Sequence, residues 1–231
     1  MFLKKILKNL VLLTCLALSA LVLYIYIFGS VDKSITPSDE EEIKKLQVNR
    51  YCEKLKSFND EIECIRAVQS TIRSLVKDVR CPPRGESIEP ASFVYRGYGC
   101  CFDRARFTEK ALLYYGFQTR HVALYDRDAH GLIGLLIPGI DSHAATEVRT
   151  SKGWMGVDSL YPFILIARNN DVLTYSNFKN KINDLMYEVK PKIFYNKNLI
   201  VIYGLYSRHG FFHGINWPTP EINFPEFLFN L

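Results

Sequence analysis

The sequence predicts an α+β fold, in which a helical N-terminal part packs on an antiparallel sheet. Two helical segments stand before residue 80, and the second carries a clear apolar stripe. A third helical pattern covers residues 101–115, and strand-like segments separated by turn residues follow it. One membrane helix is expected before this domain, because the first apolar segment is long and uncharged.

The chain can bury a full hydrophobic core without help from disulfides or metals. It has 231 residues, of which 48% are hydrophobic and 23% are charged, so one globular domain is the default expectation. The formal net charge is +5, but acidic and basic residues are mixed through most of the chain. We therefore expect no nucleic-acid partner.

The first apolar segment predicts a membrane anchor. Residues 10–28 are apolar apart from three small polar side chains, and their number is close to the ~20 that span a bilayer. Lys4, Lys5 and Lys8 precede this segment, and acidic residues 39–42 lie beyond it. The positive-inside bias therefore places the N-terminus in the cytoplasm and the rest of the chain outside, in the cell envelope.

Two forms of processing compete with an uncleaved anchor. Ala17-Leu18-Ser19 fits a signal-peptidase site, but cleavage there would leave Leu21 to Phe28 as an exposed apolar terminus. A lipoprotein site at Cys15 fits less well, because Thr14 is larger than the residue that usually precedes a lipidated cysteine. We therefore expect three parts in chain order: an anchor over 1–28, a linker over 29–38, and one domain over 39–231 with an aromatic-rich C-terminal tail.

The helical part is predicted in three pieces. Residues 39–56 are typical of a charged helix, and Ser57-Phe58-Asn59-Asp60 forms a turn and N-cap before the next one. The apolar stripe of this second helix consists of Ile62, Ile65, Val68, Ile72, Leu75 and Val76. From Cys81 to Pro90 we expect a loop, and Gly116 stands where a left-handed cap ends the helix over 101–115.

Beyond Gly116 the pattern changes to that of β-strands. The predicted strands cover residues 118–125, 132–137, 143–149, 154–157 and 199–203. A further helix is predicted over residues 177–187.

Cys101, His143 and Asp158 form the candidate catalytic set. A thiol with an ordinary pKa of about 8.5 is mostly protonated at neutral pH, whereas one at a helix N-terminus beside an imidazole titrates at roughly 3.5 to 7.5. Cys101 begins the predicted helix, His143 opens one strand and Asp158 closes the next. Neighbouring antiparallel strands bring His143 and Asp158 together, so the carboxylate can orient the imidazole toward the thiol. The set predicts a nucleophilic cysteine.

Each of these residues also fits a purely structural role. Cys101 could be an inert buried thiol, His143 a hydrogen-bonded core residue, and Asp158 the start of a turn. Arg120 is expected in a structural ion pair, and Asp103 is expected to support the helix start.

The remaining cysteines suggest disulfides, which an extracytoplasmic location permits. Cys52, Cys64, Cys81 and Cys100 allow three pairings. Cys52 and Cys64 are each six residues from Phe58 in the sequence, so a helical hairpin that turns near Phe58 would bring them side by side. One unbroken helix would hold them about 18 Å apart, which is too far for a disulfide. The sequence leaves a Cys52–Cys64 bridge and two reduced cysteines equally open.

Four motifs in this order resemble the transglutaminase-like superfamily, which shares the papain-like cysteine-peptidase architecture. The resemblance covers about residues 90 to 165. The segment from Gly99 to Asp103 matches the family pattern Gly-x-Cys-x-Asp, and the segment from Gly116 to Arg120 matches a Gly-Ile-Pro-Ala-Arg-like pattern. The segment from His143 to Val148 matches His-Ala-Trp-x-Glu-Val, and the segment from Trp154 to Asp158 matches Trp-x-x-x-Asp. The resemblance implies that Cys101 is the nucleophile, His143 the base and Asp158 the orienting acid. Cys100 does not fit, because the family glycine stands two positions before its nucleophile.

The sequence also departs from the family pattern near the acyl site. Ala145 stands where an aromatic residue usually follows His-Ala, and Gln118-Thr119 replaces the common Pro-Ala. These departures bear more on the identity of the expected substrate than on the assignment of the three catalytic residues.

The function predicted from the resemblance is acyl transfer by a membrane-anchored cysteine hydrolase or acyltransferase, acting on a peptide, protein or glycoconjugate. The alternative is a catalytically silent module that binds a peptide or glycan in the envelope. No cofactor is expected, and no metal, because no dense acidic loop is present for calcium and no glutamate follows the first of His209 and His213.

Overall fold

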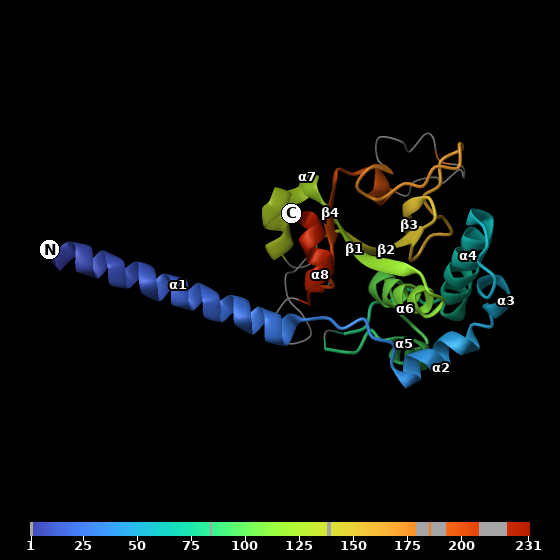
Figure 1. Ribbon diagram of the computed structural model, residues 1–231, viewed down its shortest axis with the longest axis horizontal. Helices are drawn as coiled ribbons and strands as arrows, with labels where there is room; N and C mark the ends of the chain where they lie inside the picture. The colour runs from blue at the N-terminus through green and yellow to red at the C-terminus, as the bar shows by residue number, and fades with distance from the viewer. Residues whose placement is uncertain (1, 84, 138–139, 179–184, 186–192, 208–220) are drawn as a thin grey trace.

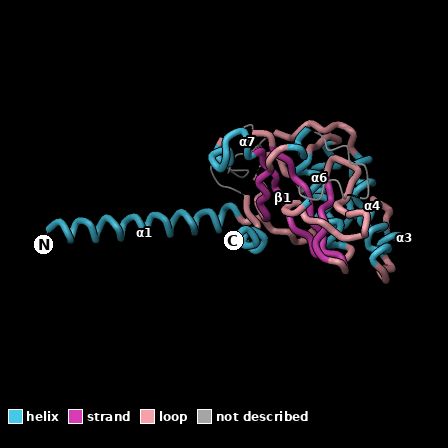
Figure 2. The backbone as a smooth tube through the Cα atoms, turned by 90° about the horizontal axis from the view of Figure 1, so that it is seen from above, coloured by secondary structure: helices cyan, strands magenta, loops and turns pink. Residues whose placement is uncertain are grey.

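The computed structural model describes residues 2–83, 85–137, 140–178, 185, 193–207 and 221–231. A long N-terminal helix projects from a domain in which helices pack on a four-stranded antiparallel sheet (Figure 1). Viewed from above, the strands lie between the helices α4 and α6 and the end from which the N-terminal helix leaves (Figure 2).

The elements follow one another in a helical part, a sheet and a short helical C-terminus. The α-helices are α1 (Phe2–Gly29), α2 (Pro37–Lys45), α3 (Asn49–Cys52), α4 (Phe58–Leu75), α5 (Pro90–Arg96), α6 (Cys101–Tyr114), α7 (Arg127–His130) and α8 (Phe224–Phe227). Short 3-10 helices are η1 (Gly131–Leu136), η3 (Ile193–Asn196) and η4 (Leu228–Asn230). The strands are β1 (Gln118–Asp126), β2 (Ser142–Thr150), β3 (Gly153–Asp158) and β4 (Leu199–Tyr203).

The sheet has the order β3-β2-β1-β4, and each neighbouring pair is antiparallel. Four of the five predicted strands are confirmed. The predicted strand over residues 132–137 is wrong, because this segment forms η1. A short apolar run does not distinguish strand from helix, and β1, from which the chain leaves toward η1, already pairs on both sides.

The helices agree with the prediction for α1, α4 and α6, and differ from it between α1 and α4 and before α6. The single helix predicted over residues 39–56 is wrong: α2 ends at Lys45, and Gln47 has a left-handed φ of 55°. The break allows Leu46 and Val48 to be buried in the core on either side of it. Helix α5, which the sequence analysis did not identify, starts with Pro90. The predicted helix over residues 177–187 lies mostly outside the described residues.

Two disulfides join the helical part. Cys52 and Cys64 face each other across the turn between α3 and α4, with an S–S distance of 2.00 Å and Cα atoms 4.9 Å apart. Of the two states that the sequence leaves open for this pair, the structure has the disulfide. Cys81 pairs with Cys100, while Cys15 and Cys101 are free, the first exposed and the second buried.

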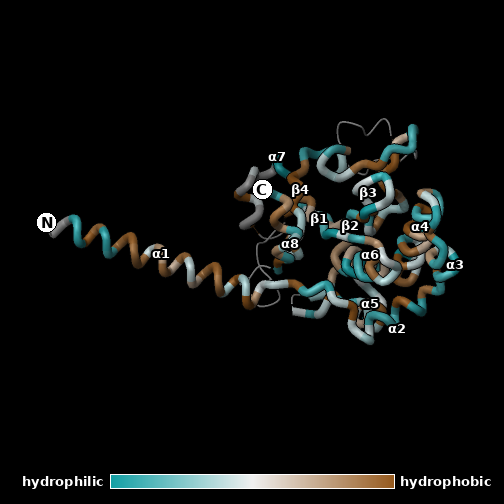
Figure 3. Tube along the Cα trace, in the orientation of Figure 1, coloured by the Kyte–Doolittle hydropathy of each residue, from teal (hydrophilic) through white to brown (hydrophobic). Residues whose placement is uncertain are grey.

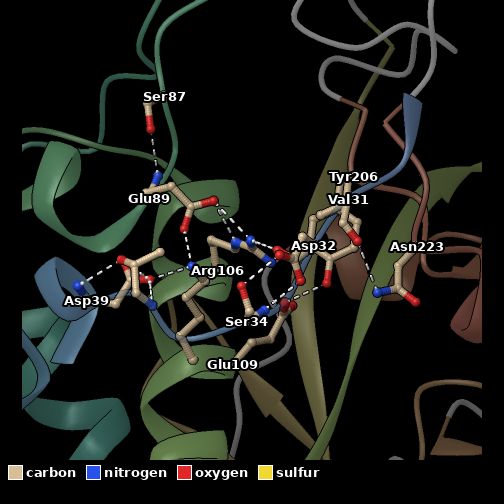
Figure 4. A network of polar contacts seen from close by, with 12 residues as sticks. Val31, Asp32, Ser34, Asp39, Ser87, Glu89, Arg106, Glu109, Tyr206 and Asn223 are labelled. Carbon is tan, nitrogen blue, oxygen red and sulfur yellow. Dashed lines mark hydrogen bonds and ion pairs between the residues drawn. The ribbon is translucent and has the colours of Figure 1, made fainter. Parts of the chain in front are cut away.

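Helix α6 is buried on almost every side, although five of its residues are charged. Asp103, Arg104, Arg106, Glu109 and Lys110 are all at most 2% exposed. Buried charges require partners, and these come from several surrounding elements. Figure 4 shows the part of this network that joins Arg106 to Glu89 and to the segment around Asp32.

The segment that follows α1 contributes directly to this network. Lys110 Nζ lies 2.6 Å from the buried carboxylate of Asp39 and 2.6 Å from Glu89. Burial favours the neutral form of Asp39, but hydrogen bonds from Lys110 and Thr36 outweigh it and hold the pKa of Asp39 below its ordinary value. Lys33 donates to the backbone carbonyl of Thr119, 2.7 Å away. The predicted linker residues therefore pack against the domain.

We expect Lys110→Met to destabilise the domain strongly. The change leaves Asp39 buried without its cation, and breaking a buried ion pair in this way costs about 3–5 kcal/mol. The free energy of unfolding measured in detergent with chemical denaturant tests it. The matched Lys45→Met change affects only exposed ion pairs with Glu41 and Glu42, so it should have no measurable effect; equal losses for both variants would contradict the role of Lys110.

Candidate active site

Cys101 is the first residue of α6, and its position is held by the residues just before it. Gly99 packs so closely against Phe93 that a Cβ atom would lie 2.5 Å from the Phe93 ring, so no larger residue fits. The Cys100 N–H donates to Asp103 Oδ2 at 3.1 Å, and Arg96 forms an ion pair with the other oxygen of Asp103. The predicted role of Asp103 at the helix start is therefore confirmed.

His143 and Asp158 meet across β2 and β3. Asp158 pairs in register with Ala145, and His143 lies two residues before Ala145, so both side chains project from the same face of the sheet. His143 Nε2 lies 3.0 Å from Asp158 Oδ2. Both residues are buried, with His143 5% exposed and Asp158 0% exposed.

Asp158 receives four hydrogen bonds or ionic contacts that fix its carboxylate. Oδ1 accepts from the backbone N–H groups of Leu160 and Tyr161, at 2.7 and 2.5 Å. Oδ2 contacts His143 and also accepts from the hydroxyl of Tyr195. Burial and the nearby Asp158 charge raise the pKa of Tyr195 well above its ordinary value, so this hydroxyl remains a donor.

Cys101 lies close enough to His143 to contribute to the electrostatics of the imidazole. Burial alone would lower the pKa of His143. The charge and hydrogen bond of Asp158, with smaller contributions from Cys101, outweigh burial and raise this pKa from 6.5 to about 10. His143 is therefore protonated at neutral pH.

The segment that carries these residues matches a known family. A model of the transglutaminase-like superfamily matches residues 49–159. Residues 49–159 belong to the transglutaminase-like superfamily. The matched segment includes all three candidate catalytic residues. Searches of curated proteins and of solved structures found no significant match to the chain.

Aromatic rings enclose the imidazole of the transglutaminase-like domain. Tyr161 stacks on His143 with ring centres 5.9 Å apart, and Phe194 and Tyr195 present their edges at the same centre-to-centre distance. These contacts exclude water from much of the ring and strengthen its interaction with Asp158.

Helix α4 supports the loop that follows Asp158. Gln69 Nε2 donates to the backbone carbonyls of Asp158 and Phe163, at 2.9 and 2.7 Å. Arg73 Nε donates to the carbonyl of Leu160 at 2.8 Å. Neither residue was predicted from the sequence, although Gln69 interrupts the apolar stripe of its helix, which is a usable signal. Tyr195 lies far along the chain in a 3-10 helix, and no sequence signal pointed to it.

Other residues singled out in the sequence have structural contacts. Arg120 binds Glu147 through Nε and Nη2, at 2.9 and 2.6 Å, and lies over the rings of Trp154 and Tyr203. The expected structural ion pair of Arg120 is therefore confirmed. His209 and His213 lie outside the described residues. Within the described part of the chain, no group of three or more His, Cys, Asp or Glu side chains is arranged to hold a metal ion.

We expect His143 to stabilise the domain more at neutral than at alkaline pH. Its folded pKa of about 10 exceeds the ordinary value of 6.5, so its contribution is complete below about pH 6.5 and is lost as the pH rises through 10. The difference in Tm between the wild type and His143→Gln should therefore narrow from pH 6 to pH 10.

The matched control for this measurement is Arg149→Gln, which changes an exposed side chain that hydrogen-bonds Gln118. Its Tm difference from the wild type should stay constant over the same range. A constant difference for His143→Gln would contradict the raised pKa.

Proposed function

We propose that this protein is a membrane-anchored cysteine enzyme that transfers acyl groups from an amide or ester to water or an amine. Cys101 acts as the nucleophile, His143 as the general acid and base, and Asp158 as the residue that orients His143. The observation that supports this proposal is the buried contact between His143 and Asp158, with Cys101 near the imidazole at the start of a buried helix.

Before substrate binds, the site favours a charged pair of Cys101 thiolate and protonated His143. An imidazole that is protonated at neutral pH stabilises a nearby thiolate, and the N-terminal end of α6 adds its positive dipole. Because Asp158 occupies Nε2, Nδ1 is the ring nitrogen that remains for the thiol. The two nitrogens therefore have separate partners, as a base oriented by a carboxylate requires.

In the first half-reaction the Cys101 thiolate attacks the acyl carbonyl carbon and forms a C–S bond. The backbone N–H groups in the first turn of a helix have no acceptor within the helix, so those at the start of α6 are suited to stabilise the negative oxygen. His143 then gives its proton to the leaving amine or alcohol, and a thioester remains on Cys101.

In the second half-reaction water or an amine attacks the thioester. Acylation removes the thiolate charge that helps to raise the pKa of His143, so the neutral imidazole becomes easier to form and can accept a proton from the attacking group. The thiolate then leaves and the acyl product is released. A silent binding module would not need this set of proton-transfer groups.

The proposed location outside the cytoplasm rests on two features. Residues Lys4–Gly29 form a helix with a mean hydropathy of 2.6 and no buried residues in its most apolar window, and the three lysines near its start favour a cytoplasmic N-terminus. Two disulfides in the domain fit an oxidising compartment.

We expect iodoacetamide at pH 6 to alkylate Cys101 rapidly. His143→Ala should slow this labelling by about two orders of magnitude, because an ordinary thiol is less than about 1% thiolate at that pH. Asp158→Asn should leave Cys101 reactive but reduce turnover of amide or ester substrates, since it disturbs the orientation of His143. Mass spectrometry that assigns the labelled residue provides the measurement.

The exposed carboxylate of Asp171 offers a matched control, and Asp171→Asn should leave both labelling and turnover unchanged. Slow labelling of Cys101 in the wild type, with the pH profile of an ordinary thiol, would contradict the nucleophile assignment and favour the binding module.

A reporter fused after Leu231 should be active only if it functions outside the cytoplasm, because the lysines at the N-terminus retain that end inside. Paired fusions to a reporter that requires the cytoplasm and one that requires an oxidising compartment test this orientation. Activity of the cytoplasmic reporter alone would overturn the proposed topology.

A further inference from the structure

The domain exposes large apolar side chains around the point where α1 leaves it. We define the apolar rim as Phe28, Ile133, Leu228, Phe229 and Leu231, each at least 60% exposed. In two perpendicular views, α7, the helical segment that follows it, and the C-terminus all lie on the side of the domain from which α1 projects (Figures 1 and 2). The rim therefore continues the apolar surface of α1, which Figure 3 shows as brown residues along the helix beyond its hydrophilic start.

The base of α1 is attached firmly to this side of the domain. The ring of Tyr26 lies 5.2 Å from that of Phe224 in α8, and Ile25 packs on the hydrophobic cluster beneath α8. The backbone of Ile222 receives a hydrogen bond from Val31 at 2.8 Å and donates one to Gly29 at 2.6 Å. These contacts fix the direction of α1 relative to the apolar rim.

The length of α1 places its last turns at the membrane surface. Its apolar stretch, residues 10–28, is about 28 Å long at ~1.5 Å per residue, which is close to the ~30 Å hydrocarbon core. Tyr24 and Phe28, whose rings lie 4.8 Å apart, then stand at the interface, where aromatic side chains are favoured. A bilayer that covers α1 to this depth also reaches the apolar rim.

We propose that the apolar rim is a second membrane contact, which docks the domain on the lipid surface. This proposal rests on the proposed function of α1 as a membrane anchor. Leu228, Phe229 and Leu231 enter the interface on one side of α1, and Ile133 enters with η1. The occupant is the lipid bilayer, because the rim is continuous with a helix whose most apolar window has no buried residue.

Docking would also set the position of the candidate active site. His143 pairs with Leu124 near the end of β1, and β1 leads after Asp126 into α7 and η1. The catalytic histidine and the docked 3-10 helix are thus at the same end of the sheet. Substrates that reach Cys101 would then be held close to the membrane surface.

The test uses single-tryptophan variants of the full chain in phosphatidylcholine vesicles with and without brominated lipid. In a background in which Trp154 and Trp217 are replaced by Phe, Phe229→Trp reports on the rim and Tyr24→Trp on the anchor. Tyr51→Trp is the matched control, because α3 lies at the far end of the domain from α1 (Figures 1 and 2). Docking predicts at least twofold quenching for Phe229→Trp and Tyr24→Trp and none for Tyr51→Trp.

The outcomes separate docking from anchoring. Quenching of Tyr24→Trp without quenching of Phe229→Trp would overturn docking and leave the anchor intact. No quenching of either variant would overturn the anchor and the docking together. Blue-shifted emission of Phe229→Trp that brominated lipid does not quench would show that a second copy of the chain covers the rim, and would also overturn lipid docking.

Discussion

The burial of charged residues along α6 is the constraint that organises the domain. A helix with charged side chains at five buried positions is stable only if each charge meets a partner, and the partners come from elements that are distant in sequence. Arg96 of α5 binds Asp103, the backbone carbonyl of Val76 just after α4 accepts from Arg104, and Asp39 of α2 binds Lys110. The helix that presents Cys101 is thus fixed by the same contacts that assemble the fold.

The candidate active site depends on two supports that approach it from different directions. The thiol comes from the start of α6, which the Cys81–Cys100 disulfide and Asp103 hold in place. The imidazole and carboxylate come from the sheet, and α4 holds the loop beyond Asp158 through Gln69. The extensive packing of α6 on β2 brings the two parts together. Neither support alone positions both the nucleophile and the base.

The electrostatics of the site follow from the balance between burial and pairing. Burial disfavours a charged imidazole, yet the pKa of His143 rises to about 10 because Asp158 is close, buried and itself fixed by backbone donors. In a low-dielectric site such pairing outweighs desolvation only when the geometry is good. The aromatic rings of Tyr161 and Tyr195 exclude water from this site, and the hydroxyl of Tyr195 also donates to the carboxylate of Asp158.

The sequence by itself determined the local elements and the order of the candidate residues. The apolar stripe of α4, the glycine after α6 and the alternating segments identify helices and strands because these signals act over a few residues, and the motifs around Cys101, His143 and Asp158 point to one chemistry. The tertiary structure decided what depends on distant contacts: the pairing of Cys81 with Cys100, the helical state of residues 131–136, and the support of Asp158 by Gln69 and Tyr195. Tyr195 illustrates the reason, since its role exists only because folding brings its hydroxyl to a carboxylate 37 residues earlier in the chain.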